Sequence, residues 1–312
     1  MRRSETWRGH NETVDRCGQG ATLPDHVISN LLLFADDTKL FKEVDSIKDS
    51  ITIQNDIDTL EKWSHDWLLR FHPDKCHVLT IGKFSNIKHA HRYMLEGEVL
   101  EHVFLEKDLG VLIDSDLSFA EHISKQVNKA NSVLGLIKRS FENLNPSMFR
   151  ILYTTFVRPH LEYAQSVWSP KLRKYVNLIE GVQRRATKLV ERIRHLPYSV
   201  RLKRLEISSL EFRRMFGDMV QVYKHVHFYD RSTIPDKLTL RTRPNRKHHF
   251  ELQPNFAKDG SLGVQTKLFY YRCVTNWNNL PRDVVDAPSI KIFKERLNRA
   301  WENHPSRYLL YN

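Results

Sequence analysis

The apolar and polar positions before residue 115 fall into short runs that are typical of strands. Residues 27–35 form an apolar run that ends in LLLFA. Asp36 and Asp37 follow, and residues 38–41 (TKLF) are expected to form the returning partner strand. An uninterrupted apolar run of this length suits a strand that is buried on both faces. The pattern therefore predicts a β-hairpin over residues 31–41, with Asp36 and Asp37 at its tip.

One helix is expected among these strands. Ser46 and Asp49, three residues later, form a capping-box pattern that predicts the start of a helix. Its apolar residues lie on roughly one face, which makes the helix amphipathic. They are Ile47, Ile51, Ile57, Leu60 and Trp63 or Trp67. Further strands are expected at residues 76–81, at residues 93–100 as a hairpin with a Glu96–Gly97 turn, and at residues 109–113.

After Asp114 the apolar residues recur with a helical period. Six of them follow one another at spacings of three and four, which predicts an amphipathic helix: Phe119, Ile123, Val127, Ala130, Leu134 and Ile137. Pro146, after Asn145, starts the next helix, and Pro159 interrupts it. A third helix is expected over about residues 172–193, a loop-rich basic stretch over 230–263, and a final α-rich segment after it. Strands followed by helices predict the α+β class.

Charge is distributed unevenly along the chain. Residues 1–80 carry ten Lys/Arg and fourteen Asp/Glu, whereas residues 171–214 carry thirteen Lys/Arg and four Glu. The formal net charge of the chain is +12. A basic block behind an acidic one indicates a polyanion-binding surface beside a site of another kind. A solvated helical face is the alternative interpretation of the basic block.

Composition places the chain among ordinary globular proteins. Forty per cent of its residues are apolar and 28% are charged, which is unlike a disordered chain. No apolar run approaches the ~20 residues that a membrane span needs, so a membrane partner is not expected. The three cysteines are far apart and odd in number, so they form no disulfide framework. An intracellular, reducing compartment is therefore expected.

The adjacent pair Asp36 and Asp37 is the first candidate for chemistry. Two neighbouring carboxylates raise each other's pKa unless a cation lies between them. Mg²⁺ prefers oxygen ligands, relieves the repulsion and suits phosphate chemistry. An ordinary Asp-Asp turn on a hairpin is the alternative.

Longer strings of residues resemble one family. The string LFADDTKLF (residues 33–41) resembles the Y/F-A-D-D box of reverse transcriptases from non-LTR retrotransposons of the jockey and chicken-repeat type. WLLRFHPDKCHVL (67–79) is similar to their W-x-L-x-F-N-x-x-K-C-x-x-L segment. Further similar phrases are DLGV (108–111), RPHLEY (158–163), QRRATK (183–188) and WNNLP (277–281). These matches follow the family order from about residue 23 to residue 301.

The resemblance implies a role for several residues. Asp36 and Asp37 would be the Mg²⁺-binding carboxylates of the polymerase box, and Lys75 would approach the leaving pyrophosphate. Leu109, Gly110 and Val111 would form the primer grip. On the thumb, Arg184, Arg185 and Lys188 would contact phosphates of an RNA template and DNA primer. No obligate protein partner is expected.

The resemblance also implies an architecture. Residues 23–114 would be an incomplete palm of few antiparallel strands plus a helix. Residues 115–195 would be a helical thumb bundle, and residues 196–312 a basic, mostly helical C-terminal region. Residues 1–22 have no counterpart in the family and are expected to be disordered.

One catalytic residue is missing from this pattern. A reverse transcriptase needs a third aspartate, on the first palm strand, to hold two metal ions, and the family places it well before the F-A-D-D box. The sequence therefore predicts a truncated RNA-directed DNA polymerase that is inactive alone. A non-catalytic, sequence-independent nucleic-acid-binding module and a protein without function are the alternatives.

Overall fold

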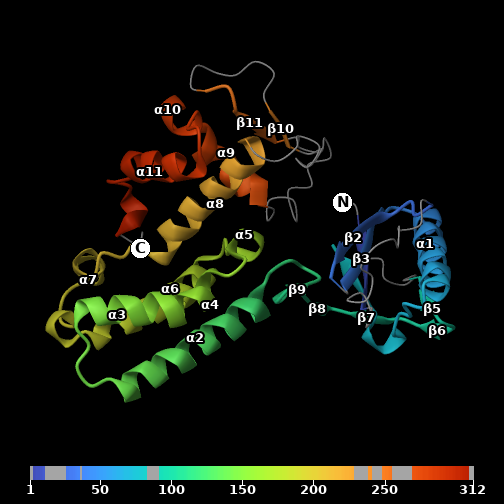
Figure 1. Cartoon of the computed structure of the whole chain (residues 1–312), viewed down its shortest axis with the longest axis horizontal. Coiled ribbons are helices and arrows are strands. Elements are labelled where there is room, and N and C mark those ends of the chain that lie inside the picture. The colour runs from blue at the N-terminus through green and yellow to red at the C-terminus, as the bar shows by residue number, and fades with distance from the viewer. Residues whose placement is uncertain are drawn as a thin grey trace. The chain divides into compact units, whose positions relative to one another are not determined.

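The computed structural model describes residues 3–10, 26–35, 37–82, 91–227, 238–240, 248–254 and 269–308. The chain divides into two compact units, residues 1–118 and residues 119–312 (Figure 1). The first unit is mainly sheet and the second mainly helix. The expected α+β class is confirmed at this coarse level.

A five-stranded sheet forms the centre of the first unit. Its order is β2-β3-β1-β4-β7, and every neighbouring pair is antiparallel except β4 and β7, which are parallel. The strands are β1 (Arg3–His10), β2 (Asn30–Phe34), β3 (Asp37–Val44), β4 (His77–Ile81) and β7 (Glu101–Val103). The hairpin expected over residues 31–41 is confirmed, and Phe34 pairs with Asp37 at its closed end. Asp36 lies outside the described residues.

Strand β1 differs from the disorder expected for residues 1–22, of which residues 11–22 lie outside the described part. It pairs with β3 on one side and with β4 on the other. Both neighbours have backbone N–H and C=O groups that need partners along these edges. A strand of almost any sequence can supply them, so an apolar pattern is not required.

Helix α1 (Ile47–Asp66) covers one face of this sheet. Its buried residues Ile53, Ile57 and Leu60 form a core with Leu40 and Val44 of β3. The expected apolar face is wrong at its beginning, because Ile47 and Ile51 are exposed. The Asp49 carboxylate accepts hydrogen bonds from the backbone N and the hydroxyl of Ser46, at 2.9 and 2.8 Å.

The expectation that β2 is buried on both faces is also wrong. The side chains of Leu32, Leu33 and Phe34 are 56, 49 and 63% exposed. Among the described residues β2 is the edge strand, with β3 as its one neighbour. A continuous apolar run cannot distinguish an edge position from a central one.

Two small hairpins complete the first unit. They are β5–β6 (Met94–Leu95 and Glu98–Val99) and β8–β9 (Leu105–Asp108 and Val111–Asp114). Glu96 and Gly97 turn the first, with φ of 50° and 77°, and Leu109 and Gly110 turn the second, with φ of 43° and 84°. Two-residue turns with both φ values positive match the twist of the strands they join. The strand expected at 109–113 is therefore wrong at its beginning, because Leu109 and Gly110 form the turn and β9 begins at Val111. A short 3₁₀ turn, η2 (Pro73–Lys75), precedes β4.

The second unit begins with helix α2 (Ala120–Ser140). All six residues of the predicted apolar stripe are buried, so this helix and its buried face are confirmed. The chain continues through α3 (Pro146–Leu152), a π turn (Tyr153–Val157), α4 (Arg158–Glu162), α5 (Gln165–Trp168) and α6 (Arg173–Ala186). Pro159 does not end the helical path. Its missing N–H is accommodated where the wider π turn passes into α4.

The remaining elements follow, and those from α8 onward surround a second core. They are 3₁₀ turns at Thr187–Leu189 and Glu191–Ile193, α7 (Tyr198–Arg204), α8 (Leu210–His227), β10 (Leu238–Leu240), β11 (Leu252–Pro254), α9 (Phe269–Asn278), α10 (Arg282–Val285), α11 (Ile290–Ala300) and a 3₁₀ turn at Pro305–Arg307. Tyr223 of α8 stacks on Phe293 of α11 at 4.2 Å between ring centroids, and Trp277 of α9 packs against the same ring. The described helices include none with the length and apolar character of a membrane span.

Candidate functional site

Asp37 and Lys75 lie at the same end of the sheet in the first unit. In the strand register His10 of β1 is opposite Asp37 of β3, and Arg8 is opposite His77 of β4. Lys75 precedes His77 by two residues, and its turn contacts β1, so it lies close to the level of His10. Adjacent strands are ~4.8 Å apart, which separates the backbones of Asp37 and Lys75 by about 10 Å. Asp36 lies outside the described residues.

The β8–β9 hairpin packs on the face of the sheet that carries Asp37. Residues 37 and 39 share one face of β3, because side chains alternate along a strand, and Leu40 faces α1 on the other side. Lys39 forms an ion pair with Asp108 at the end of β8. Glu106, also in β8, places its Oε2 at 3.1 Å from Nδ1 of His77 in β4.

These contacts bring Leu109, Gly110 and Val111 onto the face of Asp37. Asp108 immediately precedes Leu109, and Lys39 is two residues from Asp37. Sequence reasoning missed Lys39, His77, Glu106 and Asp108 as the residues that position this turn. Their alternation on β3, β4 and β8 is the signal that could have indicated them.

The described carboxylates on this face of the sheet include Asp37 and Asp108, and Asp108 forms an ion pair with Lys39. The one acidic residue of β1 is Glu5, which is opposite Lys42 of β3 in the strand register. It is five residues from His10, or about 17 Å along the strand. The residue opposite Asp37 is a histidine, and the neighbouring Lys75 is a cation. A two-Mg²⁺ centre requires several carboxylate or phosphate oxygens, and of the acidic pair at residues 36 and 37 the structure describes Asp37.

A second candidate site is a basic groove in the second unit, between α2 and α6. The two helices pack against each other (Figure 1). The groove has a volume of about 730 Å³ and contains the side chains of Lys138, Arg185, Lys188 and Arg194. The guanidinium of Arg185 donates a hydrogen bond to Asn131 Oδ1 across it, at 2.9 Å. We refer to this feature as the α2–α6 groove.

The structure thus separates the three cations that the sequence placed on one helical face. Arg185 and Lys188 line the α2–α6 groove, whereas Arg184 lies over the ring of Tyr198, 5.3 Å from its centroid. Lys138 and Arg194 were not expected in the site. Lys138 lies in the last turn of α2, one helical turn after Leu134 of the buried stripe, and its position near α6 depends on how the two helices pack.

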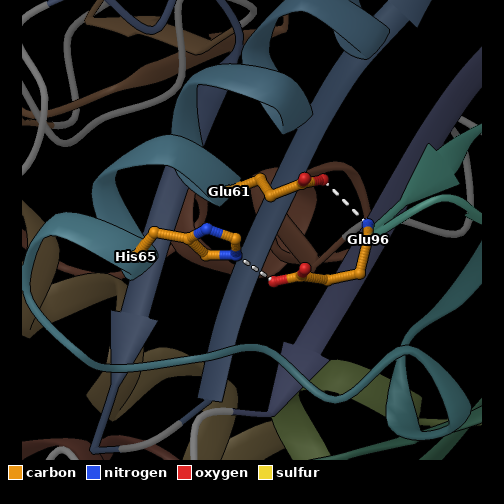
Figure 2. Close-up of side chains that lie close together, drawn as sticks. All are labelled: Glu61, His65 and Glu96. Atoms are coloured by element: carbon orange, nitrogen blue, oxygen red, sulfur yellow. Dashed lines mark hydrogen bonds and ion pairs between the residues drawn. The ribbon is translucent and has the colours of Figure 1, made fainter.

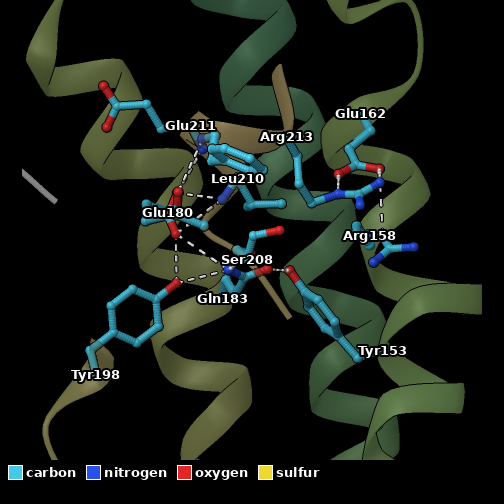
Figure 3. Close-up of polar contacts among 12 residues, drawn as sticks. Tyr153, Arg158, Glu162, Glu180, Gln183, Tyr198, Ser208, Leu210, Glu211 and Arg213 are labelled. Atoms are coloured by element: carbon cyan, nitrogen blue, oxygen red, sulfur yellow. Dashed lines mark hydrogen bonds and ion pairs between the residues drawn. The ribbon is translucent and has the colours of Figure 1, made fainter. Parts of the chain in front are cut away.

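Buried polar groups fix α6 and hence this groove (Figure 3). The Glu180 carboxylate accepts hydrogen bonds from the Tyr198 hydroxyl at 2.6 Å and from the backbone N of Leu210 at 3.0 Å. Burial raises the pKa of Glu180 above its ordinary value. Gln183 accepts a hydrogen bond from the Tyr153 hydroxyl at 2.7 Å. These bonds connect α6 to the π turn, to α7 and to the beginning of α8.

An ion-pair cluster joins α4 to α8 beside this network. Arg213 Nη2 donates to Glu162 Oε2 at 2.9 Å, and Arg213 Nε donates to the other carboxylate oxygen. Arg158 Nε lies 3.5 Å from Glu162 Oε2. Glu162 therefore balances two arginines, and neither is available to a nucleic acid without breaking the cluster.

The chain is similar to two polymerases of mobile elements. It is 27% identical over 204 residues to the RNA-directed DNA polymerase from mobile element jockey of Drosophila funebris, a match that covers 62% of this chain and 21% of that polymerase. The polymerase of the same name from Drosophila melanogaster is 23% identical over 192 residues, covering 60% and 20%. This chain therefore spans about a fifth of the length of these two relatives.

An uncharacterized protein of Caenorhabditis elegans is 24% identical over 174 residues, which are 48% of this chain and 87% of that protein. No protein-family profile matches the chain. No solved structure matches it either.

Proposed function

This chain contains a region related to the reverse transcriptases of jockey-type non-LTR mobile elements, and on that premise we propose that it binds nucleic-acid duplexes without polymerising DNA. The binding surface in this proposal is the α2–α6 groove, the counterpart of the thumb that grips the primer–template duplex. In this proposal, the end of the first unit's sheet that carries Asp37 has no catalytic role.

The convergence of four cations on one groove carries the proposal. Lys138 comes from α2, Arg185 and Lys188 from α6 and the following turn, and Arg194 from the segment beyond. Glu142 and Glu191 are the two acidic residues among those lining it, so cations outnumber anions by two to one. Contacts between Lys/Arg and phosphates supply most sequence-independent affinity for nucleic acids. They do not depend on a catalytic centre.

The surroundings of Asp37 support the proposed lack of polymerase activity. Phosphoryl transfer needs two metal ions that bridge the attacking and leaving oxygens. On the face that carries Asp37, the carboxylate of Asp108 is already paired with Lys39, and the strand register places no acidic residue of β1 opposite Asp37. Asp36 and Asp37 together do not replace the third aspartate on which the family's chemistry depends.

The binding proposal is tested by fluorescence anisotropy with a labelled RNA–DNA duplex across a salt series. Affinity should fall steeply with salt, because each neutralised phosphate releases about one counterion. The variant Lys138→Ala/Arg185→Ala/Lys188→Ala should weaken binding and flatten the logarithmic salt slope by roughly two to three units.

A matched control carries the same change in charge on one of these helices. Lys125, Lys129 and Arg139 of α2 are exposed and lie outside the α2–α6 groove. Their triple alanine variant should leave the slope nearly unchanged. Equal losses in both variants would contradict a groove-specific contact, and no salt-sensitive binding by folded protein would remove the proposal.

The absence of polymerase activity is tested separately. The protein with Mg²⁺, a primed RNA template and dNTPs should give no extension above background. Asp36→Asn and Asp37→Asn should change neither this result nor duplex affinity, since the α2–α6 groove is lined by residues of the second unit. Primer extension by the wild type that Asp37→Asn abolishes would contradict the proposed lack of polymerase activity. It would require a third carboxylate from elsewhere in the chain.

A further inference from the structure

Three side chains that can bind a metal converge where the β5–β6 hairpin meets α1 (Figure 2). Glu61 and His65 are one helical turn apart on α1, and Glu96 is the first residue of the hairpin turn. One ligand atom from each lies within 4.8 Å of the other two. His65 Nε2 and Glu96 Oε1 are 2.5 Å apart. None of the three belongs to the Asp37 end of the sheet.

Hydrogen bonds hold these ligands in place independently of an ion. Glu61 Oε2 accepts a hydrogen bond from the backbone N of Glu96, at 2.8 Å. Two turns earlier on α1, the Gln54 side chain accepts from Met94 N at 2.8 Å and donates to Met94 O at 3.0 Å. Leu95 between them is fully buried. The hairpin is therefore fixed to α1 before any metal binds.

The ligand set selects the class of cation. One imidazole nitrogen and two carboxylate oxygens suit Zn²⁺, which accepts nitrogen and oxygen ligands in a tetrahedral site. Mg²⁺ and Ca²⁺ prefer oxygen ligands alone. Zn–N and Zn–O bonds of ~2.0–2.1 Å place tetrahedral ligands about 3.3 Å from each other. The present ligand atoms, 2.5 Å apart for His65 and Glu96 and all within 4.8 Å of one another, bracket that value.

We propose that Glu61, His65 and Glu96 bind one Zn²⁺ ion, with water completing its coordination. The imidazole must offer its Nε2 lone pair, so the ion displaces any proton that His65 shares with Glu96, and this proton is released to solvent. The bound ion links α1 to the β5–β6 hairpin. It stabilises the first unit, because a ligand that binds the folded state alone shifts the unfolding equilibrium.

An ion pair between protonated His65 and Glu96 is the competing explanation, and substitution by glutamine separates the two. In Glu61→Gln the amide oxygen can still accept the hydrogen bond from Glu96 N, so the hairpin stays docked while a charged ligand is lost. Glu98→Gln is the matched control, since Glu98 is exposed on the same hairpin and outside the cluster. The chain has 16 histidines, so weak background binding is expected in every variant.

The experiment is a Zn²⁺ titration of the full chain in competition with a chromophoric chelator. Wild type and Glu98→Gln should show one tight site that Glu61→Gln, Glu96→Gln and His65→Ala weaken by at least about tenfold. Thermal melting gives a second readout. Zn²⁺ should raise the Tm of wild type and Glu98→Gln, but not that of Glu61→Gln, whose Tm in EDTA should match wild type. Equal Zn²⁺ affinity in wild type, Glu61→Gln and Glu96→Gln would overturn the proposal.

Discussion

At the scale of single residues, burial decides how His122 responds to pH. His122 lies near the beginning of α2 with 1% of its surface exposed. Its ring packs against Trp168, 5.2 Å between centroids. Burial and the nearby cations Lys125 and Lys129 lower the pKa of His122 from 6.5 to about 4. Protonation in the folded state is therefore unfavourable near neutral pH.

This shift predicts acid-sensitive stability. Between pH 6.5 and 4 the unfolded chain binds a proton at residue 122 and the folded chain does not, so the free energy of unfolding falls as pH falls through this window. The full effect of one such histidine is about 3 kcal/mol. His122→Phe should flatten the dependence, measured by urea unfolding at several pH values. His225, His227, His248 and His304 also have lowered pKa values, so part of the slope should remain.

His195 provides the comparison, because it is exposed on the segment that precedes α7. His195→Gln should leave the pH dependence as in wild type. A His122→Phe variant with an unchanged slope would show that this histidine is protonated equally well in both states.

At the scale of elements, the turn of the β8–β9 hairpin contains an unfavourable residue. Leu109 has φ of 43° and is about half exposed. The first position of such a turn favours Asn or Gly, because other side chains are strained there. Strain of this kind costs of order 1 kcal/mol and often marks functional sites.

Leu109→Asn should therefore stabilise the hairpin by about 0.5–1 kcal/mol. Hydrogen exchange of residues 105–114 measures the change locally. Leu105→Asn is the control in the same hairpin, on a strand where Asn is unfavourable, and it should decrease protection. Decreased protection in Leu109→Asn would mean that contacts of the leucine outweigh the backbone strain.

Elements with a strong local pattern could be predicted from the sequence, and those that depend on partners could not. The buried stripe of α2 and the hairpin ending at Phe34 and Asp37 follow from period and turn chemistry alone. The expected apolar face of α1 is wrong at Ile47 and Ile51, because the buried face begins at Ser50 and Ile53, and residues 47 and 51 point away from it. Strand β1 has no pattern of its own and is specified by the edges of β3 and β4.

The candidate sites follow the same rule. Asp37 and Lys75 were indicated by motifs, whereas Lys39 with Asp108, and Lys138 with Arg185, are brought together by packing of segments distant in sequence. The cluster of Glu61, His65 and Glu96 was missed for that reason. The spacing of Glu61 and His65 on a helix was visible, but nothing in the sequence placed the turn at Glu96 against it.

At the scale of the whole molecule, the division into two units separates the proposed activities. The α2–α6 groove and the polar network beneath it lie within residues 119–312. The Asp37 end of the sheet and the proposed Zn²⁺ ligands lie within residues 1–118. Each unit has its own buried core.

Residues 119–312 expressed alone should therefore fold and bind duplexes. Their unfolding should be cooperative by circular dichroism, and the salt slope of duplex binding should agree with that of the full chain within about one unit. The same fragment with Lys138→Ala/Arg185→Ala/Lys188→Ala serves as the negative control. A folded fragment without salt-dependent binding would place the contacts of the full chain in residues 1–118.

The π turn at Tyr153–Val157 makes the length of its segment as important as its composition. Such a turn holds one residue more than the α-helical turn it replaces, and each residue rotates a helix by about 100°. Deleting one residue here would swing Glu162 away from Arg213, although no side chain of the ion-pair cluster had been changed. In an alignment of related chains, a one-residue gap at this position therefore marks a rotated helix, and substitutions on either side of it should be compared only after that rotation is allowed for.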